Sequence, residues 1–377
     1  MKKLVLLLLF ILPYGVMADE LIPNANSGVL IEVNSGKIFF EKEKDKQVSV
    51  ASMTKMVAQI IIMEEIEAGH IHWNDVVTAS RNASDMGGSQ IYLEANEKMT
   101  VEDLMKGISV ASGNDATVAM AEYISGSEAK FVRRMNDKVQ ELGLKNTHFE
   151  NCTGLDEKNH YSSSYDMAMI ARELITKHPD IIRFSSIYED YLREDTNRKF
   201  WLVNTNKLIS QYSGTDGLKT GHTDDAGYCI AATAKRDGLR LIAIVLGEKD
   251  SRVRNTETMK LLDYGFLNIK LKTLKKKGDI IQEIHFSKAK PKDVKVVLKN
   301  DLNVVEEIDQ EGDYQFDVDT SSISLPIKTG SVVGKVNVTL NGKIISSEDI
   351  IVLEDVSKLS IYDIYYQNIK KLLEGYF

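Results

Sequence analysis

Three short motifs, far apart along the chain and in a definite order, constrain the fold most strongly. They are Ser52-Met-Thr-Lys55, Ser112-Gly-Asn114 and Lys219-Thr220-Gly221. Together they carry hydroxyls, amines and an amide, which can supply a nucleophile, a base and a grip on a carboxylate. A common site requires a fold that brings all three segments to one cleft. No motif is specific alone, so the prediction depends on their order and surroundings.

The first motif places a hydroxyl and an amine at the start of a predicted helix over residues 52–68. Residues three apart on a helix face the same side, so Ser52 and Lys55 point into the same space. A lysine removed from water has a lowered pKa and can take the serine proton. The chain holds a second Ser-x-x-Lys, Ser127-Glu-Ala-Lys130, which follows a Ser-Gly turn. We interpret that one as a helix N-cap.

The second motif lies in a predicted turn between two helical segments. From such a turn the Ser112 hydroxyl can relay a proton and the Asn114 amide can hold a peptide bond. Ser and Asn are also common helix caps, and the motif taken alone favours that reading.

The third motif enters a predicted strand, where Lys219 and Thr220 suit a carboxylate. Gly221 would leave room for substrate along the strand. Strict alternation would send Lys219 and Thr220 to opposite faces, so we expect an edge strand. A second Lys-Thr-Gly, residues 328–330, has no nucleophile motif nearby and is predicted to be a hairpin turn.

The pattern of elements indicates an α+β catalytic domain with an antiparallel sheet and a helical block, followed by a small all-β domain. A signal peptide is expected at 1–18, the catalytic domain at 19–270, the β-rich domain at 271–355 and an amphipathic helix at 356–377. Within the catalytic domain we expect strands at 28–33, 38–40, 199–204, 217–221, 227–235 and 239–246, mostly helix over 100–178, and a helix at 251–269.

The two ends of the chain point to export and to a membrane surface. Lys2 and Lys3 precede an apolar run that ends at Val16-Met-Ala18, as in a secretory signal. The alternative is a transmembrane helix, but the run is short for a bilayer and contains Pro13. The aromatic-rich tail predicts peripheral contact with the outer face of the cytoplasmic membrane. A helix packed on the β domain is its alternative.

Composition excludes several classes of function. The formal net charge is -8 and no long basic run occurs, so nucleic-acid binding is not expected. The seven histidines form no metal-binding motif, and we expect neither a metal nor a cofactor. The two cysteines, Cys152 and Cys229, are interpreted as small buried side chains, although their spacing does not decide whether they pair.

These motifs resemble those of the D-Ala-D-Ala carboxypeptidases, the low-molecular-mass penicillin-binding proteins of serine peptidase family S11. The resemblance covers about residues 24–270 and rests on residues 51–55, 111–116 and 216–223, with support from 151–155 and 160–161. It implies a β-lactamase/transpeptidase-like fold for the catalytic domain. The β domain and tail match the family more loosely. Cys152 stands where relatives often carry proline or another small residue.

The resemblance also implies a role for each site residue. Ser52 would attack the carbonyl between the terminal D-alanines of a peptidoglycan stem pentapeptide, with Lys55 as general base and Ser112 passing the proton to the departing D-alanine. The other expected contacts are the substrate backbone at Asn114, the terminal carboxylate at Lys219 and Thr220 beside Gly221, and an oxyanion hole from the backbone N–H groups of Ser52 and His222. β-Lactams would acylate Ser52.

Several alternatives stay open at the level of sequence. A D,D-endopeptidase or transpeptidase would use the same groups, because the choice depends on pocket shape and access of the acceptor. A class A-like β-lactamase typically carries a Glu-x-x-Leu-Asn loop, and no such string follows Asn114. A catalytically inactive penicillin-binding or wall-docking module is a rival of a different kind, but every required side chain is present.

Overall fold

The computed structural model describes residues 21–308, 312–320, 323–363, 365 and 369. The chain divides into two compact units, Met1–Leu267 and Asn268–Phe377, and each is described by itself. The predicted signal peptide and most of the predicted tail helix lie outside the described residues. The predicted α+β organisation of the first unit and the all-β character of the second are confirmed.

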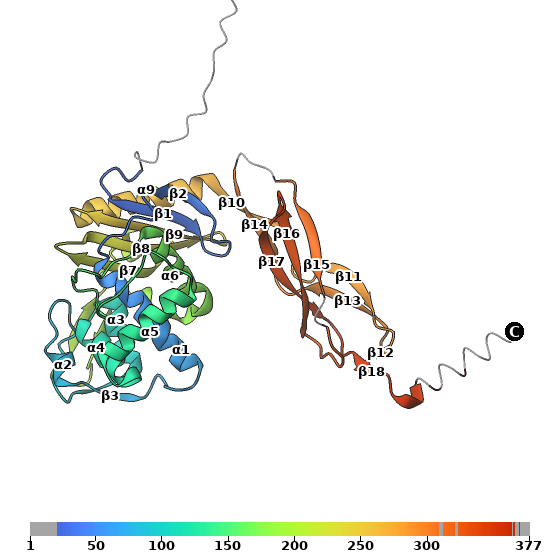
Figure 1. The fold of residues 1–377 in the computed structure, drawn as a ribbon, viewed down its shortest axis with the longest axis horizontal. Helices are drawn as coiled ribbons and strands as arrows, with labels where there is room; N and C mark the ends of the chain where they lie inside the picture. The colour runs from blue at the N-terminus through green and yellow to red at the C-terminus, as the bar shows by residue number, and fades with distance from the viewer. Residues whose placement is uncertain (1–20, 309–311, 321–322, 364, 366–368, 370–377) are drawn as a thin grey trace, which may run out of the picture. The chain divides into compact units, whose positions relative to one another are not determined.

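A five-stranded antiparallel sheet forms one layer of the first unit (Figure 1). Its order is β2-β1-β9-β8-β7, so β7 is an edge strand, as the third motif predicted. The strands are β1 (Ser27–Glu32), β2 (Ile38–Lys42), β7 (Thr215–Thr223), β8 (Gly227–Arg236) and β9 (Leu239–Glu248). A tight turn at 235–238, between the strands predicted at 227–235 and 239–246, joins β8 to β9. The predicted strand near 199–204 is present as β6 (Phe200–Val203), and it pairs with β5 (Glu189–Leu192) outside this sheet.

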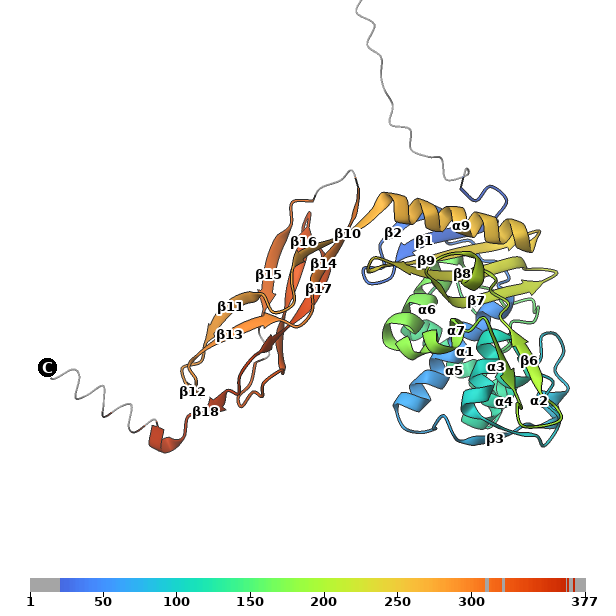
Figure 2. The same ribbon diagram turned by 180° about the vertical axis from the view of Figure 1, so that it is seen from behind.

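Helices cover both faces of the sheet. The long helix α9 (Ser251–Asn268) lies on one face and the helical block on the other, in both views (Figures 1 and 2). This explains why β1 is buried at every position and why β8 and β9 read as nearly continuous apolar runs. The block comprises α3 (Val101–Val110), α4 (Asn114–Ser125), α5 (Glu128–Glu141) and α6 (Ser164–Lys177), with the short helices α2 (Arg81–Ser84), α7 (Ile182–Ser185) and α8 (Leu208–Gln211), the 3₁₀ turn η3 (Pro179–Ile181) and the hairpin of β3 (Val76–Thr78) with β4 (Lys98–Thr100).

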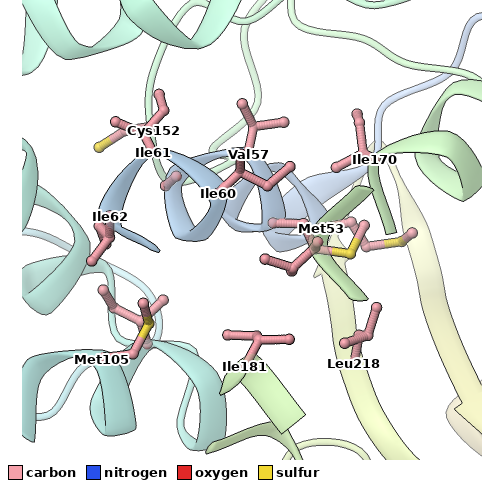
Figure 3. Packing of buried hydrophobic residues seen from close by; sticks show 14 of the residues in the cluster. Met53, Val57, Ile60, Ile61, Ile62, Met105, Cys152, Ile170, Ile181 and Leu218 are labelled. Carbon is pink, nitrogen blue, oxygen red and sulfur yellow. The ribbon is translucent and has the colours of Figure 1, made fainter. Parts of the chain in front are cut away.

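The helix α1 (Lys55–Glu67) lies at the centre of this block. Its first nine residues, through Met63, are all buried, because α4, α5 and α6 pack around it. Figure 3 shows its apolar side chains, including Val57 and Ile60, among residues from the surrounding elements. A helix that is apolar on all sides is stable only inside a core. The N-terminal end of α1 is therefore a rigid support for the residues just before it, which include Ser52.

The second unit is a separate β structure with its own apolar core. One sheet has the order β11-β13-β17-β16-β15, and β10 pairs with β14. Alternate residues such as Val294, Val296 and Leu298 point into the core. The strands are β10 (Ile269–Lys275), β11 (Ile280–His285), β12 (Ala289–Lys290), β13 (Asp293–Leu298), β14 (Leu302–Glu307), β15 (Gln315–Asp319), β16 (Val332–Leu340), β17 (Lys343–Val352) and β18 (Ser357–Lys358).

The two repeated motifs have structural roles. Ser127 caps α5, where its hydroxyl accepts from the Lys130 N–H at 3.3 Å, as predicted. The second Lys-Thr-Gly is a turn, held by Asp355, which accepts from the N–H and hydroxyl of Thr329. It is not the hairpin that was expected, because Ile327 bridges to Val356 and Val332 pairs with Ile351. Both flanks therefore pair with a third segment and not with each other.

Candidate active site

The first motif forms a tight 3₁₀ turn, η2 (Ala51–Thr54), that leads into α1. The predicted helix thus begins three residues later than expected. Ala51 has a φ of 47°, in the left-handed region that non-glycine residues rarely adopt. The Lys55 ammonium donates to the Ser52 hydroxyl at 2.7 Å and to the Thr153 carbonyl at 2.7 Å. The turn and the helix behind it hold the hydroxyl and amine together.

Lys55 is fully buried, with none of its surface exposed. Burial lowers the pKa of its amine to about 7, while Cys152 and Asp115 act in the opposite direction. An amine with this pKa is substantially neutral near neutral pH, and only the neutral form can accept a proton. The Thr153 carbonyl, which the sequence did not single out for this purpose, holds the amine beside Ser52.

The second and third motifs meet in a second hydroxyl–amine pair. Ser112, at the turn before α4, has a φ of 61°. Its hydroxyl accepts from the Lys219 ammonium at 2.8 Å, and that ammonium also donates to the Thr220 carbonyl at 3.0 Å. Lys219 is buried, and its pKa lies well below the usual value because of burial and of the nearby Lys55 and Arg254 charges. Residues 107 positions apart are thus joined at one site.

Asn114 is oriented by the loop that faces it. Its side-chain N–H donates to the Gly87 carbonyl at 2.7 Å, and its backbone N–H donates to the Ser89 carbonyl. The amide oxygen Oδ1 is buried, and no partner for it lies among the described residues. A buried acceptor without a donor is costly, so this oxygen is ready to accept an N–H from a ligand.

Asp115, the neighbour of Asn114, anchors the same loop from inside. Its carboxylate accepts the backbone N–H groups of Ile91 and Leu93 at 2.9–3.1 Å, and that of Ala116 at 2.8 Å. A buried carboxylate is stabilised by several such donors. The helix-cap alternative for the second motif is not observed, because Gly113 is the N-cap of α4 and no side chain makes a cap hydrogen bond there.

Gly221 lets the edge strand approach the nucleophile turn closely. A Cβ at this position would lie 2.6 Å from the Val50 carbonyl oxygen and 3.1 Å from the Ser52 nitrogen. The glycine is therefore required by the packing of β7 on η2, which differs from the sequence expectation that it leaves space for substrate. Gly154 likewise allows its own segment to approach η2, because a Cβ at this position would overlap the Ala51 carbonyl.

Gly221→Ala should accordingly damage both stability and the site. The added methyl group forces β7 away from η2, at a cost of about 1–3 kcal/mol in the free energy of unfolding. It also displaces the Ser52 N–H, so we expect acylation by a fluorescent penicillin to slow by roughly a hundredfold. Urea unfolding and labelling kinetics measure the two effects.

The control for this substitution is Gly143→Ala, beyond the end of α5. Gly143 has a φ of 70° and nothing within 4 Å of its Cβ position. The change should cost about 1 kcal/mol through backbone strain alone and leave labelling intact. Equal labelling rates for both variants would contradict the packing role of Gly221.

The motifs open onto a pocket of about 430 Å³ beside β7 and the start of α9. The predicted residues Ser52, Ser112 and Thr220 line it, and Gly221 and His222 belong to the same wall. Lys55, Asn114 and Lys219 are buried behind these groups. The imidazole of His222 stacks on Tyr228, with 4.0 Å between the ring centroids.

Several pocket residues were missed by sequence reasoning. Arg254 of α9 is almost completely buried and lines the pocket with Ser251 and Asn255. Its guanidinium donates to the Asn255 side-chain oxygen at 2.8 and 3.1 Å. Thr205, also in the pocket, receives the Thr220 hydroxyl at 2.8 Å. No motif marks these positions, because a single arginine in a helix and a threonine in a loop carry no local signal.

Two uncharged side chains, His160 and Cys152, belong to the segment that packs near the nucleophile turn. The His160 Nδ1 accepts from the Glu150 N–H, so its Nε2–H donates to the Thr54 hydroxyl at 2.7 Å. Burial lowers the pKa of His160 to about 4, which keeps it neutral. Burial raises the pKa of the Cys152 thiol, which donates to a Glu128 carboxylate oxygen at 3.3 Å. Both cysteines are buried and free, so they do not pair.

Comparison with known proteins agrees with this geometry. The sequence profile of the D-alanyl-D-alanine carboxypeptidases, peptidase family S11, matches residues 16–250, and that of the penicillin-binding protein 5 C-terminal domain matches residues 270–358. The D-alanyl-D-alanine carboxypeptidase DacF of Bacillus subtilis is 43% identical over 349 residues, which cover 91% of this chain and 89% of the relative.

Solved structures show the same fold. Penicillin-binding protein 5 from Haemophilus influenzae superposes with a TM-score of 0.70 at 34% identity, over 89% of this chain and 98% of that one. Penicillin-binding protein D2 from Listeria monocytogenes, solved with ampicillin bound, has a TM-score of 0.59 at 30% identity and covers 64% of this chain and 98% of its own. Together with the profile match, these similarities show that the chain belongs to the D-alanyl-D-alanine carboxypeptidase family of serine peptidases, family S11.

Proposed function

We propose that this protein is a serine-type D-Ala-D-Ala carboxypeptidase, which removes the terminal D-alanine from peptidoglycan stem pentapeptides through an acyl-enzyme. The observation that carries the proposal is the buried Lys55 amine 2.7 Å from the Ser52 hydroxyl, at the edge of a pocket that also holds the Ser112–Lys219 pair. Family membership supplies the reaction class, and the geometry supports the role proposed for each group.

In the first step Ser52 attacks the carbonyl of the penultimate D-alanine while Lys55 takes its proton. The lowered pKa of Lys55 makes the neutral amine available without a separate base. Negative charge then develops on the carbonyl oxygen. The backbone N–H groups of Ser52 and His222 are our candidates for the oxyanion hole, because Gly221 brings β7 against the Ser52 nitrogen.

Collapse of this intermediate breaks the peptide bond and needs a proton on the departing amine. Ser112 is the proposed carrier, since its hydroxyl lines the pocket and is oriented by the Lys219 ammonium. Asn114 would accept the N–H of the substrate backbone through its unpartnered Oδ1. Water then attacks the ester, and Lys55 is again the base within reach of Ser52.

The carboxylate of the terminal D-alanine would sit between β7 and α9. The Thr220 hydroxyl and the Arg254 guanidinium line this side of the pocket, and the Lys219 amine lies behind them, bonded to Ser112. Such a concentration of donors favours an anion and disfavours an amide end. The pocket therefore supports removal of a C-terminal residue over cleavage within a longer chain.

β-Lactams should occupy the same position and acylate Ser52. The Listeria protein that shares this fold was solved with ampicillin bound. The decisive assay is release of D-alanine from an acylated peptide that ends in D-Ala-D-Ala, with the Ser52→Ala protein in parallel. Absence of release by the unaltered protein under all conditions would refute the proposal.

We further propose that the protein is exported and acts at the outer face of the cytoplasmic membrane, held there by its C-terminal segment. No helix in the described part of the chain has the length and apolar character to cross a bilayer. Peripheral contact is supported by Ile361, Tyr362 and Tyr365, whose side chains are largely exposed. Exposed apolar and aromatic side chains at a chain end suit the membrane interface.

Removal of residues 359–377 should release the protein from membranes. We expect the fraction that sediments with lipid vesicles to fall roughly tenfold or more, because burial of several apolar side chains is lost. The combined substitution Ile361→Ser, Tyr362→Ser and Tyr365→Ser should act in the same direction. Unchanged sedimentation of both variants would exclude the tail as the anchor.

A further inference from the structure

The loop that faces Asn114 is held from two sides. It spans residues 85–97, between α2 and β4, and its Ser89 lines the pocket. On the inner side it is held by Asn114 and Asp115, through the hydrogen bonds described above. Its outer side contacts the β5–β6 hairpin, which takes no part in the mechanism above. The position of the loop therefore depends on both sets of contacts.

Arg193 makes most of the outer contacts. It follows β5 directly, and its side chain is 8% exposed. The guanidinium donates to the Glu97 carboxylate at 2.5 Å, to the Ile91 carbonyl at 3.0 Å and to the Tyr92 carbonyl at 3.3 Å. A planar guanidinium presents its N–H groups in fixed directions, which a lysine ammonium cannot reproduce. One side chain thus holds two successive carbonyls in the middle of the loop and the carboxylate at its end.

The rest of the hairpin strengthens this junction. Arg198 donates to Glu97 at 2.9 Å and to the Tyr92 carbonyl at 3.1 Å. The rings of Tyr92 and Phe200 pack edge to face, with 5.6 Å between their centroids. Tyr92 and Arg193 have φ angles of 57° and 56°, in the left-handed region. Residues other than glycine keep such angles only where the surrounding contacts impose them, so these contacts determine the shape of the loop.

The backbone of Ile91 connects the junction to the active site. Its N–H donates to Asp115 at 3.1 Å, and its carbonyl accepts from Arg193. Four residues earlier in the same loop, the Gly87 carbonyl accepts the side-chain N–H of Asn114. This hydrogen bond decides which way the Asn114 amide is turned, and so where its unpartnered Oδ1 lies. A displaced loop would leave the amide without the acceptor that orients it.

We propose that Arg193 is a positioning residue for Asn114 and that it acts by clamping loop 85–97 against the start of α4. The inference rests on the proposed function through the role of Asn114 at the substrate backbone. Without Arg193 the Ile91 carbonyl loses this donor, and the Gly87 carbonyl is no longer fixed in position. Recognition of an amide by Asn114 then weakens, whereas the nucleophile and its base, on η2 and α1, keep their contact.

The test compares acylation by two β-lactams that differ in one amide. Benzylpenicillin has an acylamino side chain, and aminopenicillanic acid has an amine in its place. The unaltered protein should react faster with benzylpenicillin, because Asn114 binds the N–H of that amide. Arg193→Ala should lower the ratio of the two acylation rate constants about tenfold, since a misplaced amide no longer meets the ligand. Most of the loss should fall on benzylpenicillin.

A double-mutant cycle identifies the residue through which Arg193 acts. Asn114→Ala should remove the preference for benzylpenicillin directly. In the double variant Arg193→Ala should then have little further effect on the ratio, because residues that act through one contact are not additive. Arg193→Lys should restore part of the ratio, since an ammonium can keep the Glu97 contact but not both carbonyls.

Arg172→Ala is the matched control. Arg172 in α6 also donates to two backbone carbonyls, those of Val33 and Asn34, both at 2.6 Å. Its loss should destabilise the protein as the loss of Arg193 does, because backbone acceptors are again left without their donor. The ratio of the two rate constants should nevertheless stay that of the unaltered protein. An equal fall of the ratio in Arg172→Ala would reduce the effect of Arg193 to general destabilisation and overturn the proposal.

The remaining outcomes are also decisive. An unchanged ratio in a folded Arg193→Ala protein would overturn the positioning role, and so would effects of Arg193→Ala and Asn114→Ala that simply multiply. If Arg193→Ala does not fold, Glu97→Ala removes the carboxylate of the same clamp and should lower the ratio, and an unchanged ratio there would count against the proposal equally. Failure of both β-lactams to acylate the unaltered protein would instead refute the proposed function.

Discussion

Ser52→Ala is expected to abolish covalent labelling by a fluorescent penicillin and to slow D-alanine release by roughly 10³-fold or more. The alanine removes the only atom that can form the acyl-enzyme in the arrangement described here. The fold should be retained, because the Ser52 side chain contributes a single hydrogen bond, from Lys55, to the described structure. Gel fluorescence measures labelling, and circular dichroism checks that the protein is folded.

The chain provides a matched control in Ser127→Ala. This serine belongs to the repeated Ser-x-x-Lys sequence but caps α5. Its loss should cost about 1 kcal/mol in the free energy of unfolding and leave labelling unchanged. Persistent labelling of Ser52→Ala would mean that another side chain is the nucleophile, and the proposed mechanism would be wrong.

Replacement of Lys55 should have an effect of similar size and should reveal the pH dependence of the base. Acylation by penicillin in the unaltered protein should rise about tenfold per pH unit below pH 7 and level off above it, because the protonated amine cannot accept a proton and its pKa is about 7. Lys55→Arg keeps a cation that does not deprotonate in proteins, so we expect acylation to fall roughly 10³-fold at all pH values. Stopped-flow acylation rates from pH 5 to 9 test both statements.

Lys130→Arg, in the repeated sequence, is the control for this change. Lys130 lies in the first turn of α5 and contributes its backbone N–H to the Ser127 cap. The acylation profile of this variant should match that of the unaltered protein. A Lys55→Arg protein that still acylates rapidly would assign the base to another group, with Lys219 the first candidate because its amine is also buried.

The elements around β7 show which parts of the fold can be predicted from the sequence. The strands, the turn at 235–238 and the helix at α9 follow from alternation, turn residues and helical periodicity, which are local signals. The edge position of β7 was expected from the conflict between alternation and the pairing of Lys219 with Thr220, and the sheet order confirms it. By contrast, the hairpin expected at 328–330 was wrong, because the partner of each flank is remote in sequence.

In the site, too, contacts within one segment could be predicted from the sequence and contacts between distant segments could not. Ser52 and Lys55 were predicted to face each other because three residues of helix impose that geometry. Ser112 and Lys219 are separated by 107 residues, and nothing local indicates that their side chains lie 2.8 Å apart. Arg254 and Thr153 carry no motif at all. Their importance arises from burial and from neighbours that only the packed chain supplies.

The sequence by itself determined which chemical groups the protein has and which class of reaction they serve, since motif order and residue type persist without knowledge of the fold. Only the tertiary structure decided the charge state of those groups. The pKa of Lys55 is lowered and that of the Cys152 thiol is raised by removal from water, and burial is a property of the whole packed unit. The reactivity of the site therefore depends on contacts between segments that are distant in the chain.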